Sequence, residues 1–541
     1  DTSGGKSLIG ISLNLNETED KLYITERAFE RMPNLQFLKI GGDCNRLCLP
    51  QSFSSISRKL RLLGWTRFPM TSLPPNFYPK FLVDLSMPGS KLEKLWDGDK
   101  PLTNLKRLDL SHCVNLKKLP DLSSATNLDE LDLSGCSSLV ELSSSLWNPA
   151  NLGALGLTGC LSLVKLPSSI GNAINLTSLS LNGCSSLVEL PYSIGNVTNL
   201  KILALDDCSS LVELPFSIGN LHNLWKLHLE RCSKLKVLPI NINMKSLEEV
   251  YLRNCPMLKT FPEISTNIKR LMLNGTPVEE VPLAVTSWPR LEELHMSYRE
   301  NLKDLPHALN SITDLELADK DITELVPWIK RFSRLRRLLL NGFQKLVSLP
   351  QLPGSLLFLD AENCESLERL DCSFGNPDIH LNFRNCFQLN QEARDLIIQA
   401  SNFNVAILPG GEVPAYFSDR ATGRTLTVKL NERPLHKPLR FKGCVVLGYM
   451  EEGQPRGRHS LHVSYRIRDI QNGPIVSCRP GHHHLSPFAV TGHLYTFEFE
   501  ADVTSNEPCF EFTVVTKSWS IIECGLLQLP PKYLHVDGTS D

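Results

Sequence analysis

The chain has 541 residues, which is several times the length of a usual single domain. Its residues are 42% hydrophobic and 21% charged, which is typical of a globular protein, and its net charge of −2 excludes an overall attraction to nucleic acid or to an anionic membrane. No apolar run approaches the roughly 18 residues that span a membrane, since even the run at 444–450 is far too short.

The chain begins with DTSGGKSLIG, without a methionine or a signal peptide, so we expect a fragment of a longer protein. The tripeptide GKS at 5–7 matches the end of a phosphate-binding loop. The first glycine of that motif falls outside the chain, so a flexible lead-in is the better interpretation. Segment 41–55 holds Cys44 and Cys48, and we expect a surface loop there rather than a metal site.

The frame L-x-x-L-x-L-x-x-C-x-x-L-x-x-L recurs seven times in the middle of the chain, in steps of 23, 24, 24, 24, 24 and 23 residues. The first leucines of these copies are Leu105, Leu128, Leu152, Leu176, Leu200, Leu224 and Leu247. This period and frame are those of leucine-rich repeats. Each repeat packs only on its neighbours, so one solenoid can exceed the length of an ordinary domain.

Nine weaker units flank the clear ones and bring the predicted total to sixteen. They begin at Leu8, Leu35, Leu60, Leu82, Ile268, Leu291, Ile312, Leu335 and Leu356. In every unit the x-L-x-L core predicts a short strand, whose leucines point inward and whose intervening residues face solvent on the concave side. Stacked strands of this kind form a long concave sheet that can hold a whole protein domain.

Two further positions of the frame have structural roles. A proline follows most L-x-x-L segments, and because it lacks an N–H donor it ends regular pairing and turns the chain to the convex side. Several units continue with S-I-G-N, and we expect Ile170, Ile194 and Ile218 to fill the core under the convex segment.

The seven clear repeats carry one cysteine each at the same frame position. These residues are Cys113, Cys136, Cys160, Cys184, Cys208, Cys232 and Cys255. Parallel side chains about 5 Å apart keep their Cβ atoms too far apart for disulfides, and a ladder offers no tetrahedral metal cluster. We therefore expect buried thiols that donate weakly to the backbone, which suits a reducing compartment.

The repeat pattern fades after Leu370, and the segment 373–378 reads as a domain boundary. Residues 391–403 have helical spacing, with Asn390 as the candidate N-cap. Alternating strands follow at 425–430, 461–468, 494–501 and 509–515, with apolar runs at 405–408, 444–450 and 521–529. We predict an α/β leucine-rich-repeat solenoid at 1–376 and an all-β sandwich at 377–541.

Several motifs resemble a known family. The segments 383–393, 407–423 and 520–529 resemble the C-terminal jelly-roll, Ig-like domain of plant intracellular immune receptors. The segments 59–77 and 90–98 resemble the first repeats of the same receptors. These receptors join a TIR domain, a nucleotide-binding switch and leucine-rich repeats, and the downy-mildew (recognition-of-Peronospora) group is the most similar one.

The resemblance implies a cytoplasmic receptor fragment that binds an oomycete-type effector protein directly, through its repeats and its tail domain. It also implies contact with the receptor's own nucleotide-binding domain, assembly into tetramers and NAD+ cleavage by TIR domains. ADP or ATP, magnesium and NAD+ would belong to domains outside this fragment, so we expect no cofactor and no enzymatic activity here. Neither nucleic acid nor a membrane span is expected.

The frame predicts which side chains face the concave side. Early positions such as Ala154, Gly156, Ser178 and Ser180 are small, and later ones are larger. Because aromatic and arginine side chains are enriched in binding hot spots, we predict an effector site on the later repeats and on tail loops. Its members are Lys226, His228, Glu230, Tyr251, Arg253, Arg270, Met272, His295, Tyr298, Arg456, His459 and His482.

Other interpretations stay open. For Trp225, partial burial competes with contact, and the basic residues between 330 and 337 are better read as a solvated face. No catalytic motif stands out, yet a carbohydrate-active tail is an alternative. A secreted repeat receptor is another, given sequons at Asn16, Asn175, Asn196 and Asn274, and a ubiquitin-ligase substrate adaptor is a third.

Overall fold

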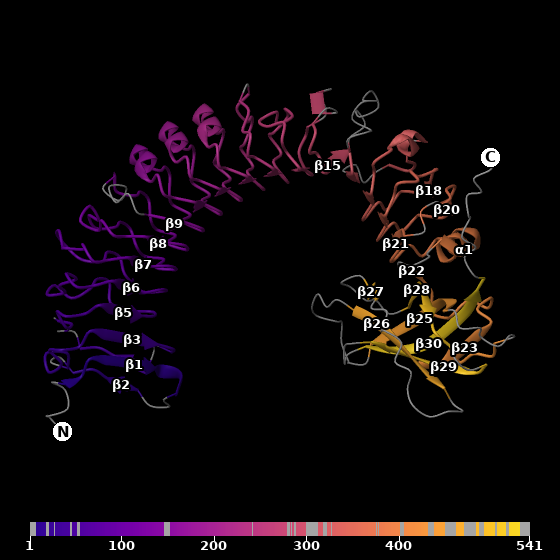
Figure 1. Ribbon diagram of the computed structural model, residues 1–541, viewed down its shortest axis with the longest axis horizontal. Helices are drawn as coiled ribbons and strands as arrows, with labels where there is room; N and C mark the ends of the chain where they lie inside the picture. The colour runs from indigo at the N-terminus through magenta and orange to yellow at the C-terminus, as the bar shows by residue number, and fades with distance from the viewer. Residues whose placement is uncertain are drawn as a thin grey trace, which may run out of the picture. The chain divides into compact units, whose positions relative to one another are not determined.

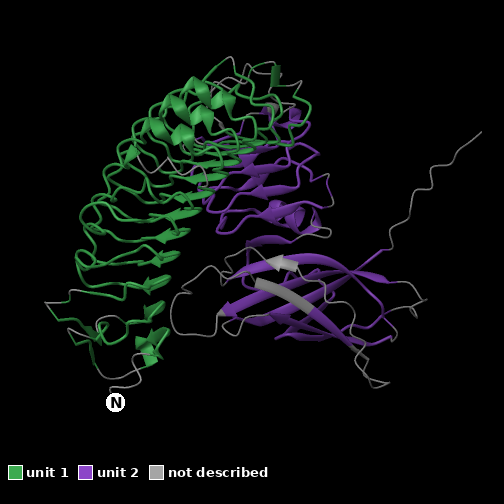
Figure 2. Ribbon diagram, turned by 60° about the vertical axis from the view of Figure 1, so that its left-hand side comes forward, with its two compact units in different colours: residues 1–297, 301–308 green, residues 298–300, 309–541 purple. Residues whose placement is uncertain are grey.

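The computed structural model divides the chain into two compact units, which are described separately (Figure 2). Unit 1 contains Asp1–Ser297 and Asn301–Ala308, and unit 2 contains Tyr298–Glu300 and Leu309–Asp541. The structure describes residues 7–17, 21–25, 28–43, 46–50, 53, 55–144, 152–240, 242–278, 282, 284–285, 288–298, 312–317, 322–325, 327–374, 376, 378–400, 405–430, 438–449, 461–469, 483–485, 492–503, 506–514 and 519–530.

Unit 1 is built on one parallel sheet in which each strand pairs with the strand of the next repeat (Figure 1). Its strands are β1 (Gly10–Asn14), β3 (Phe37–Gly41), β5 (Leu62–Trp65), β6 (Asp84–Ser86), β7 (Arg107–Asp109), β8 (Glu130–Asp132), β9 (Ala154–Gly156), β10 (Ser178–Ser180), β11 (Ile202–Ala204), β12 (Lys226–His228), β13 (Glu249–Tyr251), β14 (Arg270–Leu273) and β15 (Glu293–Tyr298). A second, two-stranded sheet joins β2 (Leu22–Tyr23) to β4 (Leu47–Cys48), and η2 (Leu15–Glu17) follows β1.

The register of this sheet stacks leucine on leucine. Leu179 of β10 pairs with Leu155 on one side and with Leu203 on the other, and both Leu179 and Leu203 are fully buried. The residues on either side of these leucines are partly exposed, because successive side chains of a strand point to opposite faces. The predicted leucine-rich-repeat solenoid is confirmed.

Short helices cover the outer side of three repeats. They are η5 (Ser168–Asn172), η6 (Tyr192–Asn196) and η7 (Phe216–Asn220), and each begins directly after a proline. Ile170, Ile194 and Ile218 are each at most 1% exposed, so they fill the core beneath these helices as expected. The proline turns the chain outward and the isoleucine anchors it there.

The cysteine ladder forms as predicted. Each thiol is fully buried and donates to a backbone carbonyl at the preceding repeat, with Sγ···O distances from 3.0 to 3.3 Å. None of the described cysteines forms a disulfide. Cys364 and Cys386 of unit 2 make the same contact, to the carbonyls of Leu340 and Ala361. This thiol-to-carbonyl hydrogen bond therefore recurs beyond the seven clear repeats.

Unit 2 begins with further parallel repeats. Its strands here are β16 (Asp314–Leu317), β17 (Arg337–Leu339), β19 (Phe358–Asp360) and β21 (His380–Asn382), with β18 (Ser348–Leu349) paired to β20 (Arg369–Leu370) and η11 (Pro327–Arg331) on the other side of the repeat. The parallel ladder therefore runs past residue 376. It ends at β22 (Ala406–Pro409), which pairs in parallel with β21 and antiparallel with β28 (His493–Ala501).

The rest of unit 2 contains two antiparallel sheets. One joins β22, β28, β25 (Leu439–Tyr449), β30 (Trp519–Leu529) and β23 (Asp419–Thr422). The other joins β24 (Thr425–Thr427), β29 (Pro508–Val514), β26 (Leu461–Asp469) and β27 (His483–Leu485). Side chains of both sheets share one apolar core, in which Phe441, Phe497 and Phe510 are fully buried. Each strand expected in this region is present.

Helix α1 (Gln391–Ala400) lies between the last repeat and β22. Asn390 caps it, since its Oδ1 accepts a hydrogen bond from the backbone N of Ala393 at 2.8 Å. The predicted cap is confirmed.

We expect Asn390→Ala to lower the free energy of unfolding of unit 2 by about 1 kcal/mol, because one N–H of the first turn loses its partner. Urea unfolding measures this difference. The control is Glu392→Ala, which changes an exposed residue of the same turn. Equal stability of both variants would rule out a structural role for the cap.

Candidate functional site

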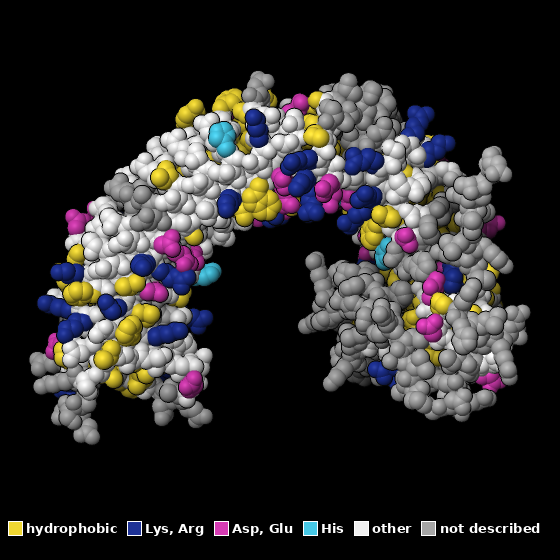
Figure 3. Space-filling view, viewed as in Figure 1, with side chains coloured by type: hydrophobic (Ala, Val, Ile, Leu, Met, Phe, Trp, Pro, Cys, Tyr) yellow, Lys and Arg dark blue, Asp and Glu magenta, His cyan; other side chains and the backbone are white. Residues whose placement is uncertain are grey.

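The concave face of unit 1 carries its largest polar side chains on β12 to β15. Two positions of each strand face outward, so the four strands present two rows across the sheet. The first row is Lys226, Glu249, Arg270 and Glu293, and the second row is His228, Tyr251, Met272 and His295. We call these eight residues the concave ladder. Charged side chains of both signs gather on this inner edge of unit 1 (Figure 3).

The first row alternates in charge. Lys226 Nζ lies 3.1 Å from Glu249 Oε2, and Arg270 Nη1 lies 3.2 Å from Glu249 Oε1. Arg270 Nε lies 3.4 Å from Glu293 Oε1. Neighbouring parallel strands are about 4.8 Å apart, so opposite charges at equivalent positions pair across the sheet.

Glu249 is the centre of this row, because Tyr251 also donates its hydroxyl to Glu249 Oε2 at 2.9 Å. Burial opposes ionisation of Glu249, but hydrogen bonds from Lys226 and Tyr251 outweigh it, and the pKa of the carboxyl is lowered from 4.5. Burial likewise opposes the charge of Lys226, yet its hydrogen bond to Glu249 raises the lysine pKa above 10.5. Both groups are therefore ionised at neutral pH.

Aromatic rings hold the second row in place. The rings of His228 and Tyr251 stack with centroids 4.5 Å apart and an interplanar angle of 6°. Lys226 Nζ lies 5.0 Å from the centroid of Tyr251 and 5.5 Å from that of Trp225, within cation–π range. His228 Nδ1 lies 3.5 Å from Asp206 Oδ2. Trp225 is 37% exposed, so part of its ring is available to a partner.

The loops that follow the strands extend the network. Arg231 donates from Nε and Nη2 to the two carboxylate oxygens of Asp207, each at 2.7 Å, which is a bidentate pair. This hydrogen bonding lowers the pKa of Asp207. Glu230 joins the neighbouring repeats, since Arg231 Nη1 lies 3.2 Å and Arg253 Nε 3.8 Å from its oxygens.

Met272 differs from its neighbours because it is only 5% exposed. Arg253 Nη2 lies 3.5 Å from its sulfur, so the guanidinium of the preceding repeat contacts the thioether. Met272 thus supports the ladder rather than presenting a surface. His295, at the other end of this row, lies 3.7 Å from Glu293 through its Nε2.

The structure brings together eight residues that the sequence predicted for the site. These are Lys226, His228, Glu230, Tyr251, Arg253, Arg270, Met272 and His295. The prediction missed the carboxylates Asp206, Glu249 and Glu293, although the two glutamates occupy the same frame position as Lys226 and Arg270. Tyr298 ends β15, but its side chain is outside the described part, as are Arg456, His459 and His482 entirely.

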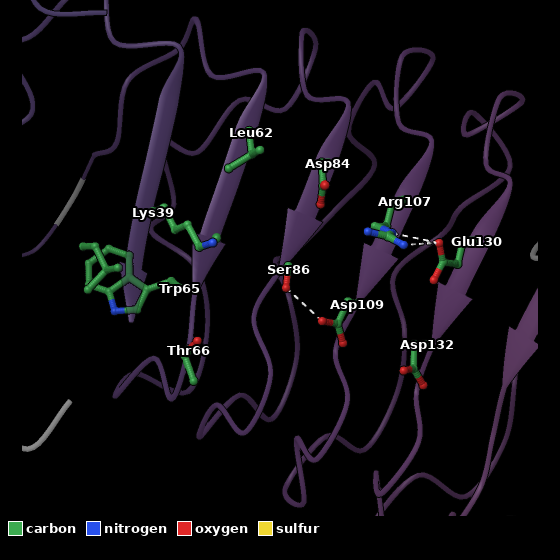
Figure 4. A pocket seen from close by; sticks show the side chains of 12 residues that line it. Lys39, Leu62, Trp65, Thr66, Asp84, Ser86, Arg107, Asp109, Glu130 and Asp132 are labelled. Atoms are coloured by element: carbon green, nitrogen blue, oxygen red, sulfur yellow. Dashed lines mark hydrogen bonds and ion pairs between the residues drawn. The ribbon is translucent and has the colours of Figure 1, made fainter. Parts of the chain in front are cut away.

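A second polar region lies on the first repeats, where the concave face encloses a hollow of about 360 Å³. Asp84, Arg107 and Glu130 form one row across three strands, and Ser86, Asp109 and Asp132 form another (Figure 4). Arg107 pairs with Glu130 at 2.6 Å, and Ser86 donates to Asp109 at 2.8 Å. Burial raises the pKa of Asp84, which Arg107 only partly offsets.

Small side chains separate the two polar regions. The outward positions of β9 and β10 are Ala154, Gly156, Ser178 and Ser180, as the frame predicted. A protein partner can approach the backbone closely over these strands because no long side chain stands in the way.

Comparisons with known proteins identify the family of the chain. A leucine-rich-repeat family model matches residues 81–100, and the C-JID domain model matches residues 408–529. The chain is 51% identical over 571 residues to the probable disease resistance protein RPP1 of Arabidopsis thaliana, in an alignment that covers 100% of this chain and 48% of that protein. The chain is a homologue of plant disease resistance proteins. The resemblance seen in the sequence motifs is thereby confirmed.

Two further relatives are also named as disease resistance proteins or disease resistance-like proteins. The disease resistance protein TAO1 of Arabidopsis thaliana is 46% identical over 580 residues, covering 95% of this chain and 48% of that protein. The disease resistance-like protein DSC2 of the same plant is 36% identical over 673 residues, covering 99% and 52%. The chain thus spans about half the length of these curated relatives. Among solved structures, a leucine-rich-repeat protein of Leptospira interrogans matches with a TM-score of 0.41 at 19% identity, over 74% of this chain and 95% of that chain.

In unit 2 of the disease resistance homologue, the region of the C-JID match is fixed to the last repeat. The backbone N of Asn385 donates to Nε2 of His493 at 3.0 Å, so this nitrogen accepts and the proton of a neutral ring is on Nδ1. Lys442 Nζ donates to the carbonyl of Gln399 in α1 at 3.2 Å. Together with the pairing of β21, β22 and β28, these contacts join repeat, helix and sheet.

The described residues contain no group of histidine, cysteine, aspartate or glutamate side chains arranged to hold a metal ion. Within the same residues, no helix is long and apolar enough to cross a bilayer. The basic residues Lys330, Arg331, Arg334, Arg336 and Arg337 are all exposed. Of these, Arg337 reaches a ring and an acid, since its guanidinium lies 5.0 Å from the centroid of Phe358 and 3.4 Å from Asp314.

Proposed function

We propose that the chain is the effector-recognition part of an intracellular plant immune receptor, and that it binds an oomycete-type effector protein directly through the concave ladder. The observation that carries this proposal is the alternating row Lys226, Glu249, Arg270 and Glu293 beside the stacked rings of His228 and Tyr251. The relatives are disease resistance proteins, which supports a role in immune recognition.

The ladder suits protein binding because its side chains are already ordered. Ordering a long side chain on association costs about 0.5–1.5 kcal/mol, and internal ion pairs reduce that term for a partner. Tyrosine and arginine are also the residue types that dominate binding energy at interfaces. Because every charge of the first row has an opposite charge beside it, we infer that shape and hydrogen bonding select the effector more than net charge does.

Intracellular placement is supported by the free thiols of the cysteine ladder, since an oxidising compartment would endanger such an array. We therefore favour a cytoplasmic receptor over a secreted one. The sequence relatives favour an immune receptor over a ubiquitin-ligase adaptor or a carbohydrate-active enzyme.

A thiol-labelling experiment tests this view of the ladder. Burial raises the pKa of Cys113 to about 11, and the pKa values of Cys160 and Cys184 to about 12, so the reactive thiolates are nearly absent at pH 8. We expect iodoacetamide to leave these three residues unmodified in the folded chain and to modify them fully in guanidinium, as mapped by mass spectrometry. Rapid labelling of the folded chain would contradict buried, protonated thiols.

We place the remaining activities of the receptor outside this chain. Effector binding then releases a nucleotide-binding switch that holds ADP or ATP with magnesium, the receptors assemble into tetramers, and TIR domains cleave NAD+. This chain itself has no catalytic role in the scheme. We also propose a repeat domain at 1–376 and a jelly-roll, Ig-like sandwich at 377–541, supported by the two packed antiparallel sheets of the second segment, although β21 and β22 carry the parallel repeat sheet across this boundary.

Binding measurements with candidate oomycete effectors test the proposal. We expect Tyr251→Ala, Arg253→Ala and Arg270→Ala together to weaken effector binding by about 100-fold, in line with hot-spot truncations. The matched control is Tyr78→Ala with Lys94→Ala and Lys117→Ala, which removes an exposed tyrosine and two ion-paired lysines elsewhere on unit 1. Unchanged binding by the first variant would reject the ladder as the effector site.

The predicted contact of the effector with the tail is better tested by substitution than by truncation. Ending the chain near Asn376 would remove β21 and β22, which continue the parallel sheet. Phe387 is 63% exposed and lies beside His493, so Phe387→Ser changes the surface at this junction while leaving the sheet intact. Weaker effector binding by Phe387→Ser would support a shared site.

A further inference from the structure

The outer side of unit 1 carries a row of large apolar side chains that the concave site does not use. Tyr192, Phe216 and Ile240 are 73%, 64% and 57% exposed. Each directly follows the proline of its repeat, so the three residues occupy one position in three consecutive repeats. We call them the outer apolar row. Hydrophobic side chains stand out on this outer edge of unit 1 (Figure 3).

The row is held in register by the repeats beneath it. Tyr192 begins η6 and Phe216 begins η7, and these two short helices pack side by side. Ser217 Oγ donates to the carbonyl of Tyr192 at 2.6 Å, which ties one repeat to the next at this position. The backbone positions that carry the exposed rings are therefore held at a fixed spacing.

The fold does not require apolar residues here. Ser168 occupies the equivalent position one repeat earlier, where it is exposed and begins η5 in the same way after Pro167. Replacing serine by tyrosine, phenylalanine and isoleucine in the following repeats exposes apolar area without filling the core. Contiguous exposed apolar area of this kind marks binding surfaces in soluble proteins.

An acidic flank accompanies the row. Glu189 and Glu213 are exposed and lie three residues before Tyr192 and Phe216. Neither carboxylate forms an ion pair within the described residues, in contrast to the paired glutamates of the concave ladder. The equivalent position is Lys165 one repeat earlier and Val237 in the repeat of Ile240, so a carboxylate accompanies each of the two aromatic rings of the row but not the isoleucine.

We propose that the outer apolar row docks an amphipathic α-helix of a partner protein, with apolar residues at positions i, i+3 or i+4 and i+7 and with lysine or arginine beside them. An α-helix rises about 5.4 Å per turn, and repeats that are about 4.8 Å apart at their concave strands lie farther apart on the outer side, so a helix laid along the row presents one or more turns to each repeat. The apolar face of such a helix covers the row, and its cations reach Glu189 and Glu213.

This surface is separate from the effector site, since it lies on the helices η6 and η7 and not on the concave strands. The proposal does not depend on effector binding. A partner can therefore occupy the outer row while the concave ladder is free or filled.

A designed peptide tests the proposal on the full chain. The probe is an 18-residue fluorescent peptide with leucine at every third or fourth position, lysine beside the leucines and alanine elsewhere. We expect it to bind at least 10-fold more tightly than a scrambled peptide of the same composition, and more tightly than a version with glutamate in place of lysine. Equal binding of the three peptides would overturn the proposal.

Two variants locate the binding. Tyr192→Ser with Phe216→Ser and Ile240→Ser is expected to weaken binding of the aligned lysine peptide by roughly 100-fold, as for loss of an aromatic anchor cluster. The matched control replaces three apolar residues that are 49%, 50% and 45% exposed at other positions of the repeats, namely Val114→Ser, Leu161→Ser and Met257→Ser. Equal losses in both variants would contradict the assignment.

Charge reversal gives an independent arm if the triple variant misfolds. Glu189→Lys with Glu213→Lys is expected to weaken binding of the lysine peptide and to strengthen binding of the glutamate peptide. An unchanged preference between the two peptides would overturn the proposed pairing of Glu189 and Glu213 with cations of the partner helix. Light scattering tests the alternative in which a second copy of the chain occupies the row. A dimer that dissociates in the triple variant would assign the row to this second copy and reject the helix proposal.

Discussion

Replacing Glu249 by lysine is expected to lower the free energy of unfolding of unit 1 by about 2–3 kcal/mol, since unlike charges become like charges beside partly covered groups. Glu249 accepts from Lys226, Tyr251 and Arg270 at 3.1, 2.9 and 3.2 Å. Its side chain is only 14% exposed, so water screens the new repulsion poorly. Urea unfolding followed by circular dichroism measures the difference.

The same substitution is expected to abolish most effector binding. A lysine at 249 stands between Lys226 and Arg270, and the three cations separate. The hydroxyl of Tyr251 then loses the carboxylate to which it donates a hydrogen bond. Binding of the effector, measured alongside stability, should fall by about 100-fold if the ladder is the contact surface.

Two companion variants make this result interpretable. Glu249→Gln keeps the shape and one acceptor oxygen, so we expect a smaller loss of about 1–2 kcal/mol. Lys226→Glu combined with Glu249→Lys restores one opposite-charge neighbour and is expected to recover part of the stability lost by Glu249→Lys alone. A double variant that is less stable than both single variants would show that the row is not held by charge alternation.

The ladder also has a defined pH window. The pKa of Glu249 is lowered from 4.5, so its contribution to stability is present above pH 4.5 and is lost as the pH falls through the folded value. The pKa of Lys226 is raised from 10.5, so its contribution is present below pH 10.5 and is lost as the pH rises through the folded value. In Glu249→Gln, the acid limb of this dependence is expected to shrink.

The repeat core could be predicted residue by residue because its spacing depends on the local chain alone. Leu179 and Leu203 are buried and Cys184 donates to Leu157 O, all from positions that the frame fixes. The helix cap at Asn390 was likewise predictable, since the cap and the backbone N–H that donates to it are three residues apart.

The position of the concave ladder was predictable, but the contacts within it were not. The frame places Glu249 beside Lys226, yet a selection by hot-spot residue type passes over carboxylates. Burial of Met272 depends on how the Arg253 side chain of the preceding repeat folds over the sulfur, which no frame position records. The alternation of charge becomes visible only when equivalent positions of consecutive strands are read across the sheet.

The end of the repeats could not be located from the sequence pattern. The leucine pattern fades after Leu370, but β21 still pairs in parallel with β19, and Cys386 still donates to the preceding repeat. The sheet continues because β22 pairs with β21 along one edge and with β28 along the other. That junction joins residues about a hundred positions apart in sequence, as with Asn385 and His493, and spacing along the chain does not encode it.

Replacing Lys442 by alanine is expected to destabilise unit 2 by about 3–5 kcal/mol, because the change leaves a buried carboxylate without one of its partners. Lys442 Nζ lies 3.2 Å from Glu498 Oε1, and the two side chains are 5% and 4% exposed. Arg440 Nη2 lies 3.0 Å from the other oxygen of Glu498. Burial lowers the pKa of Lys442, and the neighbouring carboxylate of Glu498 opposes that shift.

The position of Lys442 makes the loss spread beyond the pair. Its ammonium also donates to the carbonyl of Gln399 at 3.2 Å, so it connects β25 to the end of α1. Without it, the carboxylate of Glu498 loses one of its cationic partners, and the last turn of the helix loses a donor. We therefore expect α1 and the sheet to become less protected from hydrogen exchange together in Lys442→Ala.

A double variant removes both the uncompensated charge and the lost volume of Lys442→Ala. Lys442→Met with Glu498→Gln keeps both side chains long, removes the buried carboxylate and leaves an oxygen for Arg440, which also donates to Pro530 O at 3.2 Å. We expect it to lose less than half of the stability that Lys442→Ala loses, as measured by urea unfolding of unit 2. If the two variants are equally unstable, neither the uncompensated charge nor the lost volume explains the loss, and the hydrogen bond from the lysine ammonium to Gln399 O is the contact that matters.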